Sequence, residues 1–228
     1  LGDLPTHPEL LDHLAAKFVA DGWSVKQLLR ELVLTEAFRR DSAPTESARS
    51  KDPANDLLSH MRVKRLSGET LRDTLILLSG RLEHRMYGPG DNALARPADQ
   101  VRRSVYLQIR RNTLNPLITA FDGPKPFTTV GRRDATNVPA QSLTLLNDAF
   151  VLDAARRWAE TLDTGPTDAQ KVDQLFLRAL GRKATGTEQD AAARYLSDLR
   201  AAQAAQPDKV WADLAQSMLN LKEFLYVR

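Results

Sequence analysis

Hydrophobic residues recur at helical spacing over most of the chain, beginning with the first twenty residues. Leu10, Leu14 and Phe18 lie on one face of a helical period. Thr6 and Glu9 precede them with the spacing of a capping box. We therefore predict a first helix that starts near Thr6 and is stopped by Gly22.

A second helix is predicted directly after this one, because Ser24 and Gln27 repeat the capping-box spacing before Leu28, Leu32 and Phe38. The two helices would form an αα-hairpin. The polar residues 41–52 follow without any period and predict an exposed loop. Helical patterns then return at 57–61 and at 67–78.

The C-terminal part of the chain is also predicted to be helical. Pro139 is suited to the first position of a long helix that would extend to Gly165. Further helices are predicted at 168–180, ending at Gly181, from Thr187 onward, and at 207–220.

The middle of the chain, 87–138, differs because glycine and proline interrupt every helical period. Within it, Val105, Leu107 and Ile109 alternate with period two, which predicts one short strand or hairpin at 103–110. The predicted fold class is mainly α: a multi-helix domain with an irregular Pro/Gly/Arg-rich insertion. We treat 1–228 as a single helical domain, and because it begins at Leu1 we expect it to be an N-terminally truncated fragment of a larger protein.

Composition excludes several functional classes. The chain has 42% hydrophobic and 27% charged residues over 228 positions, which is typical of a globular domain and not of a disordered one. It contains no cysteine, so it has no disulfide, no thiol nucleophile and no attachment point for haem c. Its apolar runs are far shorter than the roughly 18 residues of a membrane span, so we expect no membrane insertion by this chain.

Charge is distributed unevenly, although the net charge is only +3. Basic residues exceed acidic ones by eight to three in 96–134 and are slightly outnumbered on both sides. Guanidinium groups suit carboxylates, sulfates and phosphates, so several of them could form an anion site. The predicted ligand-binding residues are Arg102, Arg103, Arg110, Arg132 and Arg133.

An alternative interpretation of these arginines is structural: they could bond buried carboxylates and helix ends. On a strand, Arg102 and Arg103 would point to opposite faces, as would Arg110 and Arg111, so at most half of each pair could face one ligand. Tyr106 and other aromatic residues interleave with the arginines, but no nucleic-acid motif is present and the flanking segments are net negative. We expect no nucleic-acid partner.

Catalytic and metal sites have weak support in the sequence. The four histidines lack the i, i+3 or i+4 spacing of a helical zinc site, and no metal site is predicted. Asp122 lies near the arginines, and Asp134 is the nearest second carboxylate for an acid–base pair. The favoured interpretation of Asp122 before Gly123 and Pro124 is an Asx-turn, which requires only the local backbone. The primary prediction is that the chain has no catalytic residues, with Asp122 and Asp134 as the alternative.

Six strings of the sequence together resemble one family. They are LPTHPELLD at 4–12, KRLSGETLRD at 64–73, RRSVY at 102–106, RRDAT at 132–136, PAQSLTLLN at 139–147 and EFLYV at 223–227. The chain resembles the C-terminal domain of unknown function found in large planctomycete and related bacterial proteins, behind cytochrome c-like and other planctomycete-specific domains.

The resemblance implies an exported, extracytoplasmic protein, periplasmic or at the cell surface, with haem c in an upstream domain and no cofactor in this chain. We therefore expect a non-catalytic accessory or interaction domain whose partners are other domains of the same polypeptide or another protein. The alternative is a hydrolase, lyase or binding module for anionic polysaccharide, which would use the basic middle of the chain.

Overall fold

The computed structural model describes residues 4–129, 133–163, 167–202 and 207–227. These residues form two compact units: unit 1 is Leu1–Lys64 and unit 2 is Arg65–Val227. The expectation of one domain over 1–228 stays a prediction.

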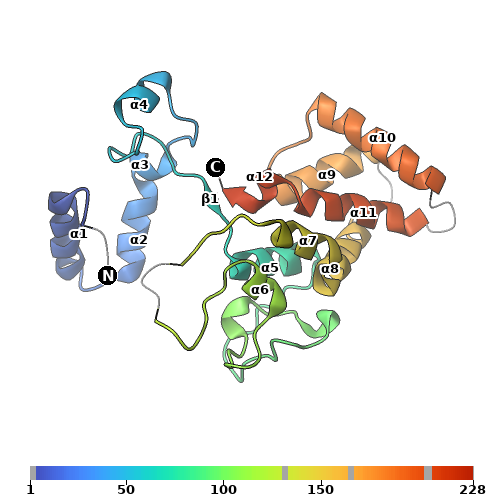
Figure 1. Ribbon diagram of the computed structural model, residues 1–228, viewed down its shortest axis with the longest axis horizontal. Helices are drawn as coiled ribbons and strands as arrows, with labels where there is room; N and C mark the ends of the chain where they lie inside the picture. Colours follow the sequence, from blue (N-terminus) through green and yellow to red (C-terminus); the bar gives the residue numbers. More distant parts are fainter. Residues whose placement is uncertain (1–3, 130–132, 164–166, 203–206, 228) are drawn as a thin grey trace. The chain divides into compact units, whose positions relative to one another are not determined.

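The structure is mainly helical, as predicted, with twelve α-helices in its described residues (Figure 1). Those of unit 1 are α1 (Pro8–Ala20), α2 (Val25–Leu34), α3 (Glu36–Arg39) and α4 (Glu46–Lys51). Those of unit 2 are α5 (Gly68–Leu78), α6 (Pro116–Ala120), α7 (Pro139–Asn147), α8 (Ala149–Glu160), α9 (Asp168–Leu180), α10 (Gly186–Ala202), α11 (Pro207–Leu219) and α12 (Lys222–Leu225). Two short strands, β1 (Lys64–Arg65) and β2 (Tyr226–Val227), pair with each other.

The helical hairpin of unit 1 is confirmed, with changes at its ends. Helix α1 starts at Pro8 with Pro at its first position, and the Thr6 hydroxyl bonds the His7 ring, so the predicted Thr6–Glu9 box is wrong. Ser24 caps α2 as predicted by accepting a bond from the Gln27 N–H. Thr35 then ends α2 and caps the separate helix α3.

Two predictions for the rest of unit 1 are wrong. The expected loop at 41–52 contains α4, because Thr45 accepts a bond from the Ala48 N–H and caps a short helix. The expected helix at 57–61 is absent from the described residues. Asn55 and Leu58 there have positive φ angles of 56° and 54°, which a right-handed helix does not allow.

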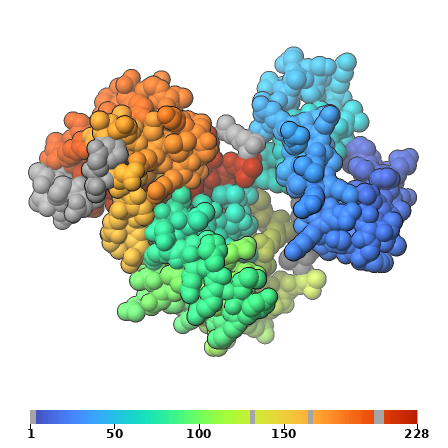
Figure 2. All heavy atoms as spheres, turned by 180° about the vertical axis from the view of Figure 1, so that it is seen from behind, coloured from blue at the N-terminus to red at the C-terminus, as the bar shows by residue number. Residues whose placement is uncertain are grey.

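Unit 2 is built around an apolar core. Helix α8 packs most extensively against α11 and also against α5 and α7. In Figure 2 the gold atoms of α8 lie between the orange atoms of α9 and α10 and the teal and green atoms of α5 and the loop after it. Trp158 of α8 is fully buried in this core, as are Leu71 and Leu75 of α5.

The helices of unit 2 largely follow their predicted positions. Ser67 caps α5. Helix α9 ends at Gly181 as predicted, and the Thr167 side chain caps its start. The predicted long helix from Pro139 is two helices, because the Asp148 side chain accepts a bond from the Phe150 N–H and caps α8. Its predicted end at Gly165 lies outside the described residues. The capping residue before α10 is Thr185, not Thr187.

The predicted strand at 103–110 is wrong. Residues Ser104–Tyr106 form a 3-10 helix, η2, after an earlier one, η1 (Pro97–Asp99). Only isolated bridges occur nearby, joining Glu83 to Arg102, Asp91 to Leu107, and Arg110 to Thr113. The segment has no continuous partner strand among the described residues, so its alternating pattern has another cause.

Candidate functional site

A cleft of about 670 Å³ lies at the N-terminal end of α5. We call it the large cleft. Its lining comes from α5, the 103–109 segment, α6 and the 123–126 loop. Helices α5 and α6 lie beside each other (Figure 1), and Gly68 permits this because a Cβ there would lie 2.8 Å from the Ile118 Cα.

Apolar side chains form one part of the lining. Val105, Leu107 and Ile109 all face the large cleft, together with Leu114 and Ile118. Val105 and Ile109 are 72% and 62% exposed, whereas Leu107 is buried. Leu107 and Ile109 therefore share one side of the extended stretch after η2, whereas Val105 lines the cleft from η2 itself.

Two ion pairs form the charged part of the same lining. The guanidinium of Arg133 donates to both carboxylate oxygens of Glu69 at 2.9 Å. The Nε of Arg103 lies 3.5 Å from Asp73. Each pair joins one basic and one acidic residue, so the charges in the lining of the large cleft cancel.

The acidic members of these pairs are held in their ionised form or already hydrogen-bonded. Burial of Glu69 opposes ionisation, but the hydrogen bonds and charge of Arg133, a backbone hydrogen bond and the Ser67 hydroxyl together outweigh it and lower the pKa of Glu69. The carboxylate of Asp73 accepts bonds from the N–H and the hydroxyl of Ser104 at 2.6 and 2.7 Å. The lining residues that the structure describes include no histidine or lysine, and these residues offer hydrogen bonds and apolar contact.

Arg102 has a structural environment, unlike its neighbour Arg103. Its side chain is 1% exposed and its guanidinium donates to the carbonyls of Tyr87 and Pro89 and to the Asp91 carboxylate. It also stacks over the Tyr106 ring at 4.0 Å. Arg102 therefore fixes the loop at 85–91 against the rest of unit 2, and its charge faces no cavity described above.

The remaining predicted arginines lie apart. Arg110 lines a second, smaller pocket, and the neighbouring Arg111 lies over the Phe127 ring at 5.3 Å. Arg132 lies outside the described residues. The structure thus brings Arg103 and Arg133 to one cleft, and places Arg102 and Arg110 elsewhere.

Asp122 and Asp134 share no hydrogen bond in the described part of the chain. The Asp122 carboxylate instead accepts bonds from Arg65 and from the N–H and hydroxyl of Thr136. Burial raises the pKa of Asp122, but these donors outweigh burial and lower it. A carboxylate that is ionised in this way is a poor general acid at neutral pH.

Glu69 and Asp73 are the site residues that the sequence analysis did not identify. They are four positions apart, so a predicted helix at 67–78 already places both carboxylates on one face. The apolar residues of the lining were noticed for their alternation, but they were assigned to a strand.

Among the described residues no three histidine, cysteine, aspartate or glutamate side chains are close enough to hold a metal ion. None of the helices in the described ranges combines the length and apolar character that crossing a bilayer requires.

Comparison with known proteins gave one match. A family model described as "PSD1: Protein of unknown function (DUF1553)" matches residues 1–196. No curated protein and no solved structure matches the chain.

Proposed function

Because the chain belongs to the PSD1 family of proteins of unknown function (DUF1553), we propose its function from the geometry of unit 2. We propose that it is a non-catalytic interaction domain that binds a segment of polypeptide in the large cleft. The observation that carries this proposal is the exposure of Val105 and Ile109 inside a hollow whose charged groups are already paired.

The combination of groups in the large cleft supports a polypeptide as the ligand. Exposed apolar side chains in a hollow with a polar edge are typical of protein–protein contact. Ser67, Thr70 and Thr119 lie in the same lining. The first two bond each other and the Thr119 hydroxyl donates to the Asn115 carbonyl, so what these oxygens offer a ligand is a lone pair that can accept a main-chain N–H. The neutral balance of Glu69, Asp73, Arg103 and Arg133 gives no preference for a strongly charged ligand.

Site-specific photo-crosslinking tests this proposal in the full-length protein in its native host. A benzophenone amino acid in place of Ile109 should form a crosslink to one discrete polypeptide segment, identified by mass spectrometry. The matched control is the same replacement of Leu177 in α9, which is 46% exposed and does not line the large cleft. Adding Val105→Asp should abolish the crosslink from position 109, because a charge would then occupy the apolar lining.

Equal crosslinking from positions 109 and 177, or none from 109, would contradict the proposal. The competing function is a hydrolase or lyase for anionic polysaccharide that uses Asp122 and Asp134. Incubation of the purified protein with sulfated and uronate polysaccharides distinguishes the two. New reducing ends or unsaturated uronates that disappear in Asp122→Asn would favour the enzyme.

We further propose that the domain acts outside the cytoplasm, attached to a larger protein with a haem c domain. This rests on the family resemblance of the sequence. The chain itself has no cysteine to attach haem. A covalent-haem stain of the full-length protein from its native host should be positive, and a negative stain would contradict this part of the proposal.

A further inference from the structure

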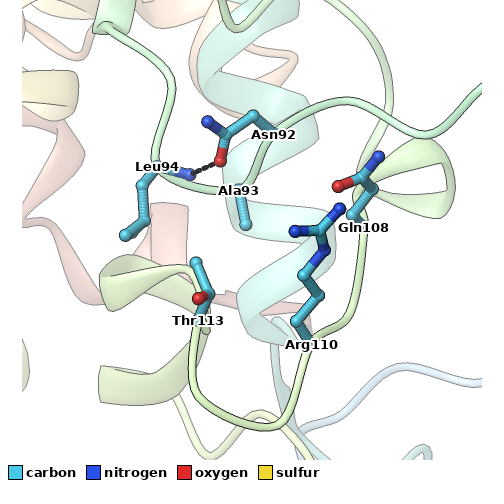
Figure 3. A pocket seen from close by; sticks show the side chains of 6 residues that line it. All are labelled: Asn92, Ala93, Leu94, Gln108, Arg110 and Thr113. Carbon is cyan, nitrogen blue, oxygen red and sulfur yellow. Dashed lines mark hydrogen bonds between the residues drawn. The ribbon is translucent and has the colours of Figure 1, made fainter.

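A second pocket of about 360 Å³ lies beside 107–110, the stretch that follows η2. We call it the Arg110 pocket. It is lined by Asn92, Ala93, Leu94, Gln108, Arg110 and Thr113. Figure 3 shows the side chains of Arg110 and Gln108 directed from one segment toward the turn that contains Asn92 and Ala93.

The alternation of the sequence explains why two pockets share one segment. Odd positions such as Leu107 and Ile109 line the large cleft, and the even positions Gln108 and Arg110 line the Arg110 pocket. In an extended backbone successive side chains point to opposite sides. One side of the segment is therefore apolar and the other is polar and basic.

The polar side chains of the Arg110 pocket have unused hydrogen-bonding capacity. The side chains of Gln108, Arg110 and Thr113 make no hydrogen bond or ion pair with any residue that the structure describes. Asn92 uses its side-chain oxygen to accept the Leu94 N–H at 3.0 Å, which leaves its amide NH₂ as a donor (Figure 3). Four side chains around one hollow can thus donate to the same ligand.

The charges near this pocket favour a single negative group. Its lining contains one guanidinium and no carboxylate. The nearest acidic residue in sequence, Asp91, already accepts a hydrogen bond from Arg102 at 3.0 Å. This differs from the large cleft, where each of the two arginines is paired with an acid.

We propose that the Arg110 pocket binds the side-chain carboxylate of an aspartate or glutamate in the polypeptide partner. A guanidinium fork matches the two oxygens of a carboxylate, and one positive charge balances one carboxylate better than a phosphate dianion. Ala93 and Leu94 offer an apolar wall to the methylene beside it, and no aromatic ring lines the pocket for stacking of a sugar. The choice of a polypeptide rests on the proposed function, since the same segment lines the large cleft.

Nuclear magnetic resonance titration of the whole chain tests the pocket with small probes. N-acetyl-aspartate amide should shift the Nε–H signal of Arg110 and the side-chain amide signal of Gln108 in a saturable way. N-acetyl-asparagine amide, which has the same shape without the charge, should not. Low ionic strength should be used, because salt screens an exposed charge pair.

Variants of two adjacent arginines provide the matched control. Arg110→Gln should lower the affinity for the aspartate probe at least tenfold. Arg110→Lys should lower the affinity less, because it keeps the positive charge although it loses the forked geometry of the guanidinium. Arg111→Gln should leave binding unchanged, because Arg111 lies over Phe127 and does not line the pocket. Unsaturable shifts, equal shifts with the asparagine probe, or unchanged binding in Arg110→Gln would each overturn the proposal.

Three further probes are titrated in the same way: galacturonate, galactose as its uncharged counterpart, and inorganic phosphate. Tighter binding of galacturonate or phosphate than of the aspartate probe would overturn the assignment to an acidic side chain. The crosslink from position 109 is measured independently. If it fails while the aspartate probe binds, the proposed polypeptide cleft is wrong and the carboxylate pocket stands; the reverse result removes only the pocket.

Discussion

Unit 2 has an apolar core, whereas the buried residues in the described part of unit 1 are all polar. In the described part of unit 1, only Asp52 and Asn55 are buried, and helices α1–α4 contain no buried side chain. In unit 2 a cluster of apolar side chains around Trp158 is buried. Leu29 and Val33 of α2 are exposed although they belong to a strongly amphipathic sequence. Amphipathic periodicity therefore predicts a helix but not what covers its apolar face.

The buried polar residues of unit 1 hold a loop through local hydrogen bonds. The Asp52 carboxylate accepts the N–H groups of Asp56 and Leu57 at 2.8 and 3.0 Å. Asn55 donates to the His60 carbonyl and accepts from the Ser59 hydroxyl. Such a loop is specified by side chains close in sequence, whereas the core of unit 2 depends on residues far apart in the chain.

The largest effect expected from this difference comes from matched tryptophan substitutions. Trp158→Ala should lower the free energy of unfolding by about 3–5 kcal/mol, because it leaves a cavity in the core. Trp23→Ala in unit 1 should lower it by less than about 1 kcal/mol, since Trp23 is 67% exposed and contacts Phe18 at one edge. Urea unfolding followed by circular dichroism measures both. Equal losses would break the comparison.

A second test asks whether unit 2 also depends on a buried polar group. Arg102→Met should destabilise it by about 3 kcal/mol, because the carbonyls of Tyr87 and Pro89 and the carboxylate of Asp91 lose their donor. Arg103→Met is the control and should stay within about 0.5 kcal/mol, as its side chain is 62% exposed. The same urea unfolding applies. A stable Arg102→Met protein would contradict the structural role of Arg102.

A third and smaller effect is expected for the polar loop of unit 1. Asp52→Ala should lower the free energy of local opening of this loop by about 1–2 kcal/mol, because two backbone N–H groups lose their acceptor. Amide hydrogen exchange should then become faster at Asp56 and Leu57. Asp56→Ala is the control, since the Asp56 side chain is exposed. Unchanged exchange in Asp52→Ala would show that the loop is held by something other than Asp52.

The smallest expected effect is a dependence on pH in unit 2. Hydrogen bonds from Arg182 lower the pKa of Glu188 from 4.5 to about 2, burial opposes this, and the Thr185 N–H adds to it. The folded protein thus binds this proton less readily than the unfolded chain does. The stabilisation is present above pH 4.5 and is lost as the pH falls toward 2.

Glu188→Gln should remove this part of the acid sensitivity, while its cost at neutral pH should stay within about 1 kcal/mol, as for partly exposed ion pairs. Unfolding of the two proteins across this pH range measures the difference. Parallel stability curves for the variant and the parent protein would show that the Arg182–Glu188 pair does not contribute.

Local signals explain which parts of the fold the sequence predicts. Helix α9 was predicted correctly because Thr167 and Gly181 are capping residues adjacent to its ends. The break at Asp148 was missed because the same residue can occupy the interior of a helix or cap a new one. A choice of that kind depends on the packing of α7 and α8, which periodicity does not contain.

The candidate sites likewise combine features that the local sequence predicts with features that it does not. Alternation at 105–109 and the spacing of Glu69 and Asp73 are visible in the sequence, and both describe the large cleft correctly once the helix and the extended segment are known. The role of Arg102 is not visible, because its partners are mostly backbone carbonyls of an irregular loop 11 to 17 positions earlier. Backbone carbonyls carry no residue identity, so no sequence motif reports them.

The extended stretch 107–110, which both pockets share, also constrains how this domain can change through insertions and deletions. Adding or removing one residue there would exchange the two sides, turning Gln108 and Arg110 toward the large cleft and Ile109 away from it. A change of two residues would preserve the sides. The linings of the large cleft and the Arg110 pocket therefore depend on the same alternation of odd and even positions. Related domains would keep or lose both linings together.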